Sequence, residues 1–101
     1  MHQIGQSFAV SALRELMAEH FAAPFPTSVE KGRDYGEVDA VMIGADIYGW
    51  ALRAQGGGLL PIDGDRLRAA RDALARSLLA FPDDAQPYYT QLVALADAAL
   101  E

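Results

Sequence analysis

Residues 38–54, VDAVMIGADIYGWALRA, form the most apolar run of the chain and contain its only tryptophan, Trp50. Wound as a helix with 3.6 residues per turn, this run has two apolar sides. One side holds Val38, Val41, Ala45, Tyr48 and Leu52, and the other holds Ile43, Ile47, Ala51 and Ala54. A helix that is apolar around most of its circumference belongs in the middle of its domain or in an interface. The run is therefore predicted to form the central helix of the fold.

The central helix is predicted to begin after Asp34, because Asp34 and Glu37 have the spacing of a capping box. It is predicted to end at the glycines 56–58, which allow the left-handed backbone angles at which helices commonly end. A rival prediction makes residues 38–43 a buried strand that pairs with residues 58–62, which would give an α+β fold. We favour the helix, because an isolated pair of strands adds little stability.

Two glycines, Gly44 and Gly49, lie in the interior of the predicted central helix. Interior glycine costs roughly 0.5–1 kcal/mol relative to alanine. The glycines would be useful where another backbone approaches the helix closely. The alternative is that they weaken or bend the helix.

Three further amphipathic patterns accompany the central one. Apolar residues recur at three- and four-residue steps over residues 7–22, 64–81 and 85–100, and proline or a capping aspartate marks several of their ends. With the central helix over residues 35–55, these patterns predict four helices. The connection 23–36 is rich in Pro, Gly and charged residues and is predicted to lie on the surface. We therefore expect an all-α chain that forms one compact, four-helix bundle-like domain.

Composition narrows the classes of function. The chain has 101 residues, of which 51% are apolar and nineteen are alanine, and this suits one small domain of closely packed helices. It has no cysteine, which excludes disulfides, thiolate zinc sites and iron–sulfur clusters. A net charge of -6 argues against binding to nucleic acid. The excess of arginine over lysine, seven to one, together with the many alanines favours a bacterial source.

The sequence also bears on the expected location. Asp39, Asp46 and Arg53 interrupt the best candidate for a segment that crosses a bilayer. The first ten residues, MHQIGQSFAV, lack the basic start and the long apolar stretch of a signal peptide. We therefore expect a soluble cytoplasmic protein without a membrane partner.

No set of residues in the chain has the spacing of a recognisable catalytic or metal site. The two histidines, His2 and His20, belong to no Glu-x-x-His pattern, and no serine stands in a G-x-S-x-G context. His20 is predicted to lie at the end of a helix beside Phe21, where a structural role is favoured over a catalytic one. We expect no catalytic residues, no metal and no cofactor, and enzymatic activity is the less favoured interpretation.

Three charged residues, Asp39, Asp46 and Arg53, stand seven residues apart on the predicted central helix, with Met42 and Trp50 at the edges of their stripe. Seven residues span about 10 Å along a helix, so the two aspartates are too far apart to share one metal ion. Two interpretations remain open for this stripe. It is either solvated, as charged residues usually are, or it lines a crevice or a subunit contact.

Two functional hypotheses follow. The first is a small acidic interaction or regulatory module that binds a protein partner, or itself as a homodimer, through the central helix. Its predicted contact residues are Trp50, Tyr48, Arg53, Asp46, Asp39 and Met42. The alternative is a small-molecule-binding protein or minor enzyme with a pocket between the second and fourth helices. The predicted pocket residues are Asp46, Tyr88 and Tyr89, with Arg53 beside them.

Overall fold

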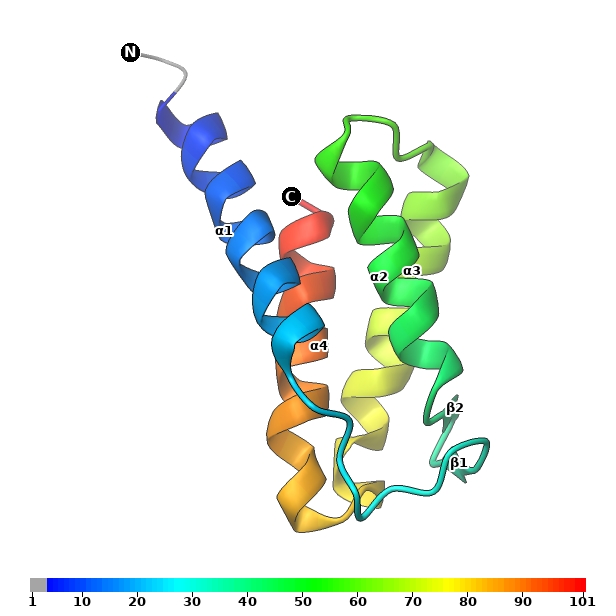
Figure 1. Cartoon of the computed structure of the whole chain (residues 1–101). Coiled ribbons are helices and arrows are strands. Elements are labelled where there is room, and N and C mark those ends of the chain that lie inside the picture. Colours follow the sequence, from blue (N-terminus) through cyan, green and yellow to red (C-terminus); the bar gives the residue numbers. More distant parts are fainter. Residues whose placement is uncertain (1–3) are drawn as a thin grey trace.

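The four amphipathic patterns form four helices in the computed structural model, which describes residues 4–101 and their side chains from Ala12 onward. The helices are α1 (Ile4–Ala22), α2 (Met42–Gln55), α3 (Pro61–Ser77) and α4 (Gln86–Ala99). A hairpin of β1 (Asp34–Tyr35) and β2 (Val38–Asp39) precedes α2, and the 3₁₀ turns η1 (Leu78–Ala80) and η2 (Asp83–Ala85) join α3 to α4. The helices pack lengthwise beside one another (Figure 1). The predicted all-α, bundle-like fold is confirmed.

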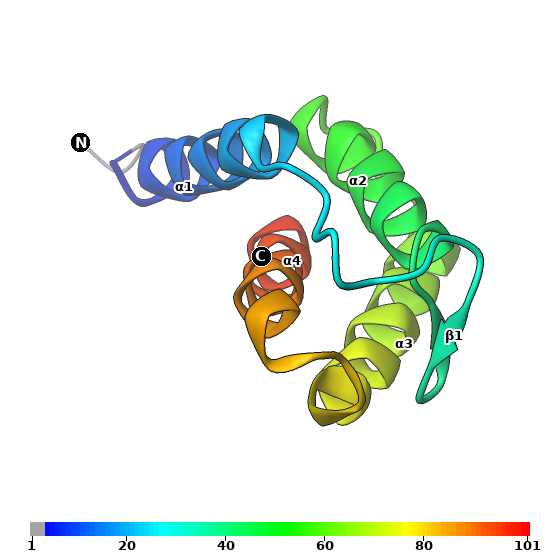
Figure 2. The same cartoon turned by 60° about the horizontal axis from the view of Figure 1, so that its bottom comes forward.

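The core is built around α4, which packs against α1, α2 and α3. Figure 2 shows α4 inside the arc made by the other three helices. Its fully buried side chains are Tyr89, Leu92, Leu95 and Ala96. The prediction that residues 38–54 form the central helix is therefore wrong. α4 buries five side chains, among them the large Tyr89, Leu92 and Leu95, whereas α2 lies at the flank and buries a single side through Ile43, Ile47 and Ala51.

The hairpin corrects the predicted start of the second helix. Its antiparallel pairs are Asp34 with Asp39 and Tyr35 with Val38. The chain can turn within two residues because Gly36 has a φ of 63°, in the left-handed region that suits hairpin turns. The helix therefore begins at Met42 and not at residue 35. The rival strand prediction also changes, because β2 pairs with β1, whereas residues 58–62 form a loop and the start of α3.

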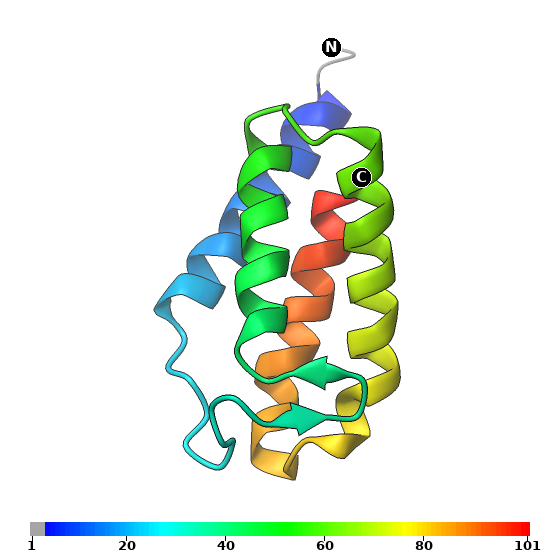
Figure 3. The same cartoon turned by 90° about the vertical axis from the view of Figure 1, so that its right-hand side faces the viewer.

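The hairpin lies beside the C-terminal end of α3 (Figure 3), where polar contacts hold it in place. The Ser77 hydroxyl accepts a hydrogen bond from the Glu37 N–H at 2.9 Å and donates one to the Ala73 carbonyl at 2.7 Å. The Arg76 guanidinium donates to both carboxylate oxygens of Glu37, at 2.8 and 2.9 Å. A Cβ at Gly36 would stand 2.6 Å from the Ser77 Oγ, so only glycine fits here without a shift. The hairpin is thus held against α3, and the chain continues from it into α2.

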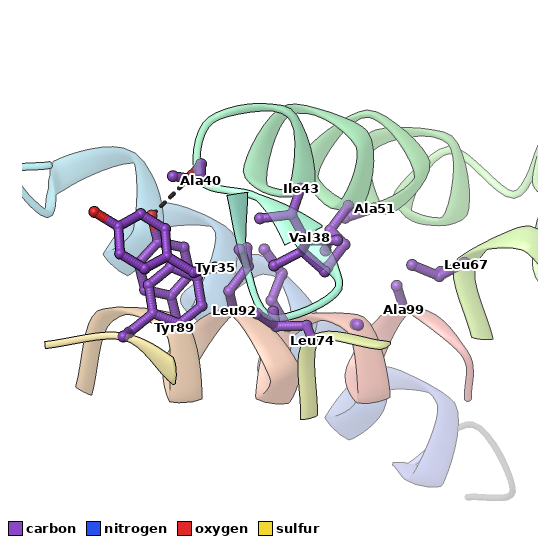
Figure 4. Close-up of a cluster of buried hydrophobic side chains, with 14 of the residues drawn as sticks. Tyr35, Val38, Ala40, Ile43, Ala51, Leu67, Leu74, Tyr89, Leu92 and Ala99 are labelled. Carbon is purple, nitrogen blue, oxygen red and sulfur yellow. Dashed lines mark hydrogen bonds between the residues drawn. The ribbon is translucent and has the colours of Figure 1, made fainter. Parts of the chain in front are cut away.

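Stacked aromatic rings close the same end of the bundle. The Phe81 ring stacks on Tyr89 with centroids 3.8 Å apart and on Tyr35 with centroids 4.8 Å apart. The hydroxyl of Tyr89 donates a hydrogen bond of 2.8 Å to the carbonyl of Ala40, as the dashed line in Figure 4 shows. This bond links Tyr89, in the core, to Ala40, which lies just before the start of α2.

The remaining helix bounds differ from the predicted ones by a few residues. α1 begins at Ile4 and ends at Ala22, where the prolines that follow it were expected to stop it. α3 begins at Pro61, because proline is well suited to the first helical position, and Asp63 lies in its first turn. α3 ends at Ser77, and η1 takes the place of its predicted last turn. Within residues 4–101, no helix combines the length and the apolarity needed to cross a membrane.

Candidate functional site

The end of α1, the first half of α2 and one side chain of α4 surround a hollow of about 430 Å³, open to solvent, that we call the aromatic pocket. Five rings border it, those of His20, Phe21, Phe25, Tyr48 and Tyr88. None of the residues that line it carries a carboxylate, an ammonium or a guanidinium group. It is the kind of apolar concavity, with a few polar atoms, in which proteins bind small molecules.

The pocket exists because one apolar side of α2 stays uncovered. The side with Ile43, Ile47 and Ala51 packs into the core, whereas Val41 and Leu52, on the other predicted apolar side, are 40% and 50% exposed. The helix therefore has two apolar sides, as its sequence indicates, but a single buried one. Part of the uncovered side forms one wall of the aromatic pocket.

Gly44 adds depth to the pocket. A Cβ at this position would stand 3.8 Å from the Leu92 Cδ2 and 4.0 Å from the His20 Nε2, which are ordinary van der Waals distances. A Cβ at Gly49 would meet nothing within 4 Å. Neither glycine therefore receives a neighbouring backbone, and the predicted close approach at these positions is absent from the described structure. At Gly44, the missing methyl group leaves room in the pocket.

His20 is the most unusual side chain of the pocket. Its ring lies 5.7 Å from the ring of Tyr48 and 5.3 Å from that of Tyr88, between centroids. Its Nδ1 atom is buried and has no hydrogen-bond partner among the described residues. Burial lowers the pKa of His20 below its ordinary value of 6.5, because the charged ring would lose hydration without gaining a partner. At neutral pH the ring is therefore uncharged.

The hydroxyl of Tyr88 is a hydrogen-bond donor at the pocket wall. Burial raises the pKa of Tyr88 above its ordinary value of 10, so this hydroxyl remains protonated at physiological pH. Together with the neutral imidazole, it gives an otherwise apolar pocket groups that can orient a ligand.

A second hollow of about 570 Å³ adjoins the aromatic pocket, and we call it the acidic hollow. The two hollows share Ala23, Phe25 and Tyr88 as lining residues. The rings of Phe25 and Tyr88 meet edge to face, with centroids 5.8 Å apart. The charged residues in the lining of the acidic hollow are Glu19 and Asp84.

The predicted charged stripe does not hold together as one site. Asp46 and Arg53 line a smaller, polar hollow of about 350 Å³ together with Trp50. There the Arg53 guanidinium donates a hydrogen bond of 3.1 Å to Asp63, which is only 7% exposed. Arg66 approaches the other oxygen of Asp63 at 3.8 Å. Two arginines thus balance the negative charge of one buried carboxylate. The contact between Arg53 and Asp63 links α2 to α3, so the residues of this hollow have a structural role.

The other predicted contact and pocket residues have separate places. Asp39 accepts hydrogen bonds from the backbone N–H groups of Val41 and Met42, at 2.9 and 2.8 Å, and so helps to start α2. Met42 itself is more than half exposed. Tyr48 and Tyr88 border the aromatic pocket, whereas Tyr89 lies in the core and is fully buried.

His20, Phe21, Phe25 and Gly44 are pocket residues that sequence reasoning missed. The available signal was a group of aromatic residues around the end of the first helix, two of them adjacent in the chain and one between two prolines. That signal does not say which helix the rings will face. Their convergence on α2 and α4 depends on how the segment after α1 crosses the bundle.

The comparisons with known proteins add no further constraint on the site. No family model matches the chain, and neither the curated proteins nor the solved structures give a significant match. Among the described residues, no group of three or more histidine, aspartate or glutamate side chains has an arrangement that could hold a metal ion.

Proposed function

We propose that this protein binds a small organic molecule in the aromatic pocket, with the apolar part of the ligand between α1, α2 and Tyr88. The observation that carries the proposal is the pocket itself: five rings around about 430 Å³ of open space, beside an uncovered apolar side of α2. Binding pockets for small molecules commonly have this size and this mixture of apolar walls and few polar groups. The proposal keeps the predicted location between the second and fourth helices but replaces two of the predicted residues, Asp46 and Tyr89.

The polar groups of the pocket favour binding over catalysis. A catalytic histidine is usually oriented by a carboxylate or carbonyl on one ring nitrogen, which also stabilises the charged ring. The Nδ1 of His20 has no such partner among the described residues, and burial disfavours its protonation. A neutral imidazole and the Tyr88 hydroxyl are suited to orienting a ligand.

A pair of glycine substitutions tests this proposal. N-phenyl-1-naphthylamine, a neutral apolar dye whose fluorescence rises in apolar surroundings, serves as the probe. Gly44→Ala places a methyl group in the pocket at ordinary contact distances, so the fold is retained and the affinity for the dye is expected to fall roughly tenfold.

The matched control is Gly49→Ala, in the same helix but outside the aromatic pocket. It is expected to leave the dye affinity unchanged. Equal affinities of the two variants and the wild type, or no binding of the dye at all, would contradict a ligand site in this pocket.

A second candidate function is the interaction module of the first hypothesis. Its support is the exposure of large apolar side chains on α2 and at its N-cap, namely Met42, Leu52 and Val41. Size-exclusion chromatography with light scattering on the wild type and on Leu52→Glu tests self-association as a homodimer. Leu52 is a cleaner choice than Trp50, which packs partly against the core. A wild-type protein that stays monomeric over a wide concentration range removes the homodimer.

A further inference from the structure

The outward face of α2 is apolar along its middle. Met42, Ala45, Gly49 and Leu52 lie on the side of the helix opposite its buried side, and all four are exposed. We call these four residues the α2 seam. The outward face of a surface helix is ordinarily polar. Figure 3 shows α2 with no other helix in front of it. The α2 seam is therefore an apolar surface that no described part of the chain covers.

The spacing of the α2 seam suits packing against another helix. Its residues are separated by three, four and three positions, which is the spacing of a coiled-coil contact. Ala45 and Gly49 are small, so the backbone of a second helix can come close at these positions. A Cβ at Gly49 would meet nothing within 4 Å, so the space beside it is open in the single chain.

Two charges along one edge of the α2 seam indicate what covers it. Asp46 and Arg53 are seven residues apart on that edge, which is about 10 Å along a helix. Asp46 is exposed and forms no ion pair with any residue that the structure describes. The side chain of Arg53 is 62% exposed, and it shares the single carboxylate of Asp63 with Arg66. This edge therefore presents one unpaired negative charge and one surplus positive charge.

A two-fold axis brings these two charges together. If two copies of α2 lie antiparallel, with the axis midway between Asp46 and Arg53, each aspartate is level with the arginine of the other copy. The same register places Leu52 of each copy level with the space between Ala45 and Gly49 of the other. One arrangement thus pairs the charges and packs the apolar residues. Such self-complementarity is what a symmetric contact between identical subunits requires.

We propose that this protein forms a symmetric dimer through the α2 seam, with the two α2 helices antiparallel and two Asp46–Arg53 ion pairs between the copies. This proposal rests on the second candidate function, self-association, and is independent of the ligand proposed for the aromatic pocket. One helix from each copy makes a small interface, so we expect a Kd of about 10–100 µM.

Sedimentation equilibrium of the full chain, over concentrations on both sides of this Kd, tests the proposal. Asp46→Lys turns both ion pairs into contacts between like charges, so the dimer is expected to weaken about tenfold or more at low ionic strength. The fold is retained, because Asp46 makes no ion pair within the described chain. The control is Glu15→Lys, the same change of charge at an exposed position of α1, which is expected to change the Kd by less than about twofold.

A mixture of two variants tests the antiparallel register. Arg53→Glu also places like charges opposite each other in its own dimer. In a mixed dimer of Asp46→Lys with Arg53→Glu, both pairs again have opposite charges. The mixture is therefore expected to associate about as tightly as the wild type, and each variant alone much more weakly. Circular dichroism checks that Arg53→Glu is folded, since Arg53 also supports Asp63; if it is not, Asp46→Lys and its control decide the outcome.

The outcomes separate this geometry from self-association in general. A wild-type chain that stays monomeric at every concentration removes both, while the ligand site of the aromatic pocket is unaffected. If the wild type dimerises and Asp46→Lys dimerises equally well, self-association stands and the geometry is overturned. A mixture of folded variants that associates no better than each variant alone overturns the geometry as well.

Discussion

The hydrogen bond between Tyr89 and Ala40 offers the sharpest test of the described core. The Tyr89 side chain is fully buried, and its hydroxyl donates to the Ala40 carbonyl at 2.8 Å across a long sequence separation. Burial is the main cause that raises the pKa of Tyr89, so the hydroxyl remains a donor throughout the physiological range. Replacement of Tyr89 by phenylalanine removes this donor and keeps the ring.

The expected loss of stability follows from what the substitution leaves behind. The ring of phenylalanine at position 89 can still stack on Phe81, whose centroid lies 3.8 Å away, so little packing is lost. The carbonyl of Ala40, a residue that is 1% exposed, loses a partner that water cannot readily replace. A buried polar group left unsatisfied costs about 1–3 kcal/mol. For a chain of 101 residues, a loss near 1 kcal/mol lowers Tm by about 4–8 °C.

Urea denaturation followed by circular dichroism measures the free energy of unfolding, and Trp50 fluorescence provides a second probe. The control is Tyr88→Phe, a half-buried neighbour for whose hydroxyl no hydrogen bond is found among the described residues, so its expected change lies within about 0.5 kcal/mol. Equal stabilities of Tyr89→Phe and the wild type, or an equal loss in both variants, would refute this account of the core.

Three further predictions concern the backbone and pH. Gly36→Ala is expected to destabilise the protein by more than Gly32→Ala in urea denaturation, because both positions have positive φ but only at Gly36 would a Cβ stand 2.6 Å from a side-chain oxygen of α3. Similar losses in the two variants would remove the steric argument. Gly44→Ala and Gly49→Ala are each expected to raise stability by roughly 0.5–1 kcal/mol, since both sites are helical and uncrowded; a loss at Gly44 would mean that the pocket is tighter than described. The pKa of His20 is lowered in the folded state, so its contribution is fully present above pH 6.5 and declines as pH falls below that value. His20→Phe should flatten this part of the pH–stability profile, and an unchanged slope would contradict it.

Much of the helical architecture could be predicted from local patterns. The end of α1 at Ala22 and the bounds of α4 follow from prolines and apolar periodicity, which act within one or two turns of helix. The start of α2 could not be predicted in this way. The hairpin before it depends on Ser77, some forty residues further along, whose hydroxyl fits only against a glycine at position 36. The spacing of Asp34 and Glu37 predicts the start of a helix, but the long-range contact with Ser77 stabilises a hairpin there instead.

The candidate site shows the same division. Its residue types were visible, since Tyr48 and Tyr88 were among the predicted contact or pocket residues. Asp46 and Arg53 were grouped with them because residues seven apart share a helix face, but Asp63 from α3 draws Arg53 toward a different hollow. Helical periodicity places side chains on one face of one helix. It carries no information on which neighbour that face meets.

The amino-acid sequence by itself determined that α2 has two apolar sides, because side-chain direction along a helix repeats every 3.6 residues whatever surrounds it. Only the tertiary structure decided which side is buried. α4 buries more side chains than α2 and lies inside the arc of the other three helices (Figure 2), so α4 takes the central place and α2 the flank. One side of α2 then closes the core, and the other is left to form a wall of the aromatic pocket with rings from α1, α4 and the segment that joins α1 to the hairpin. Which face of a helix is buried depends on how all four helices pack together, so the sequence of one helix alone does not determine it.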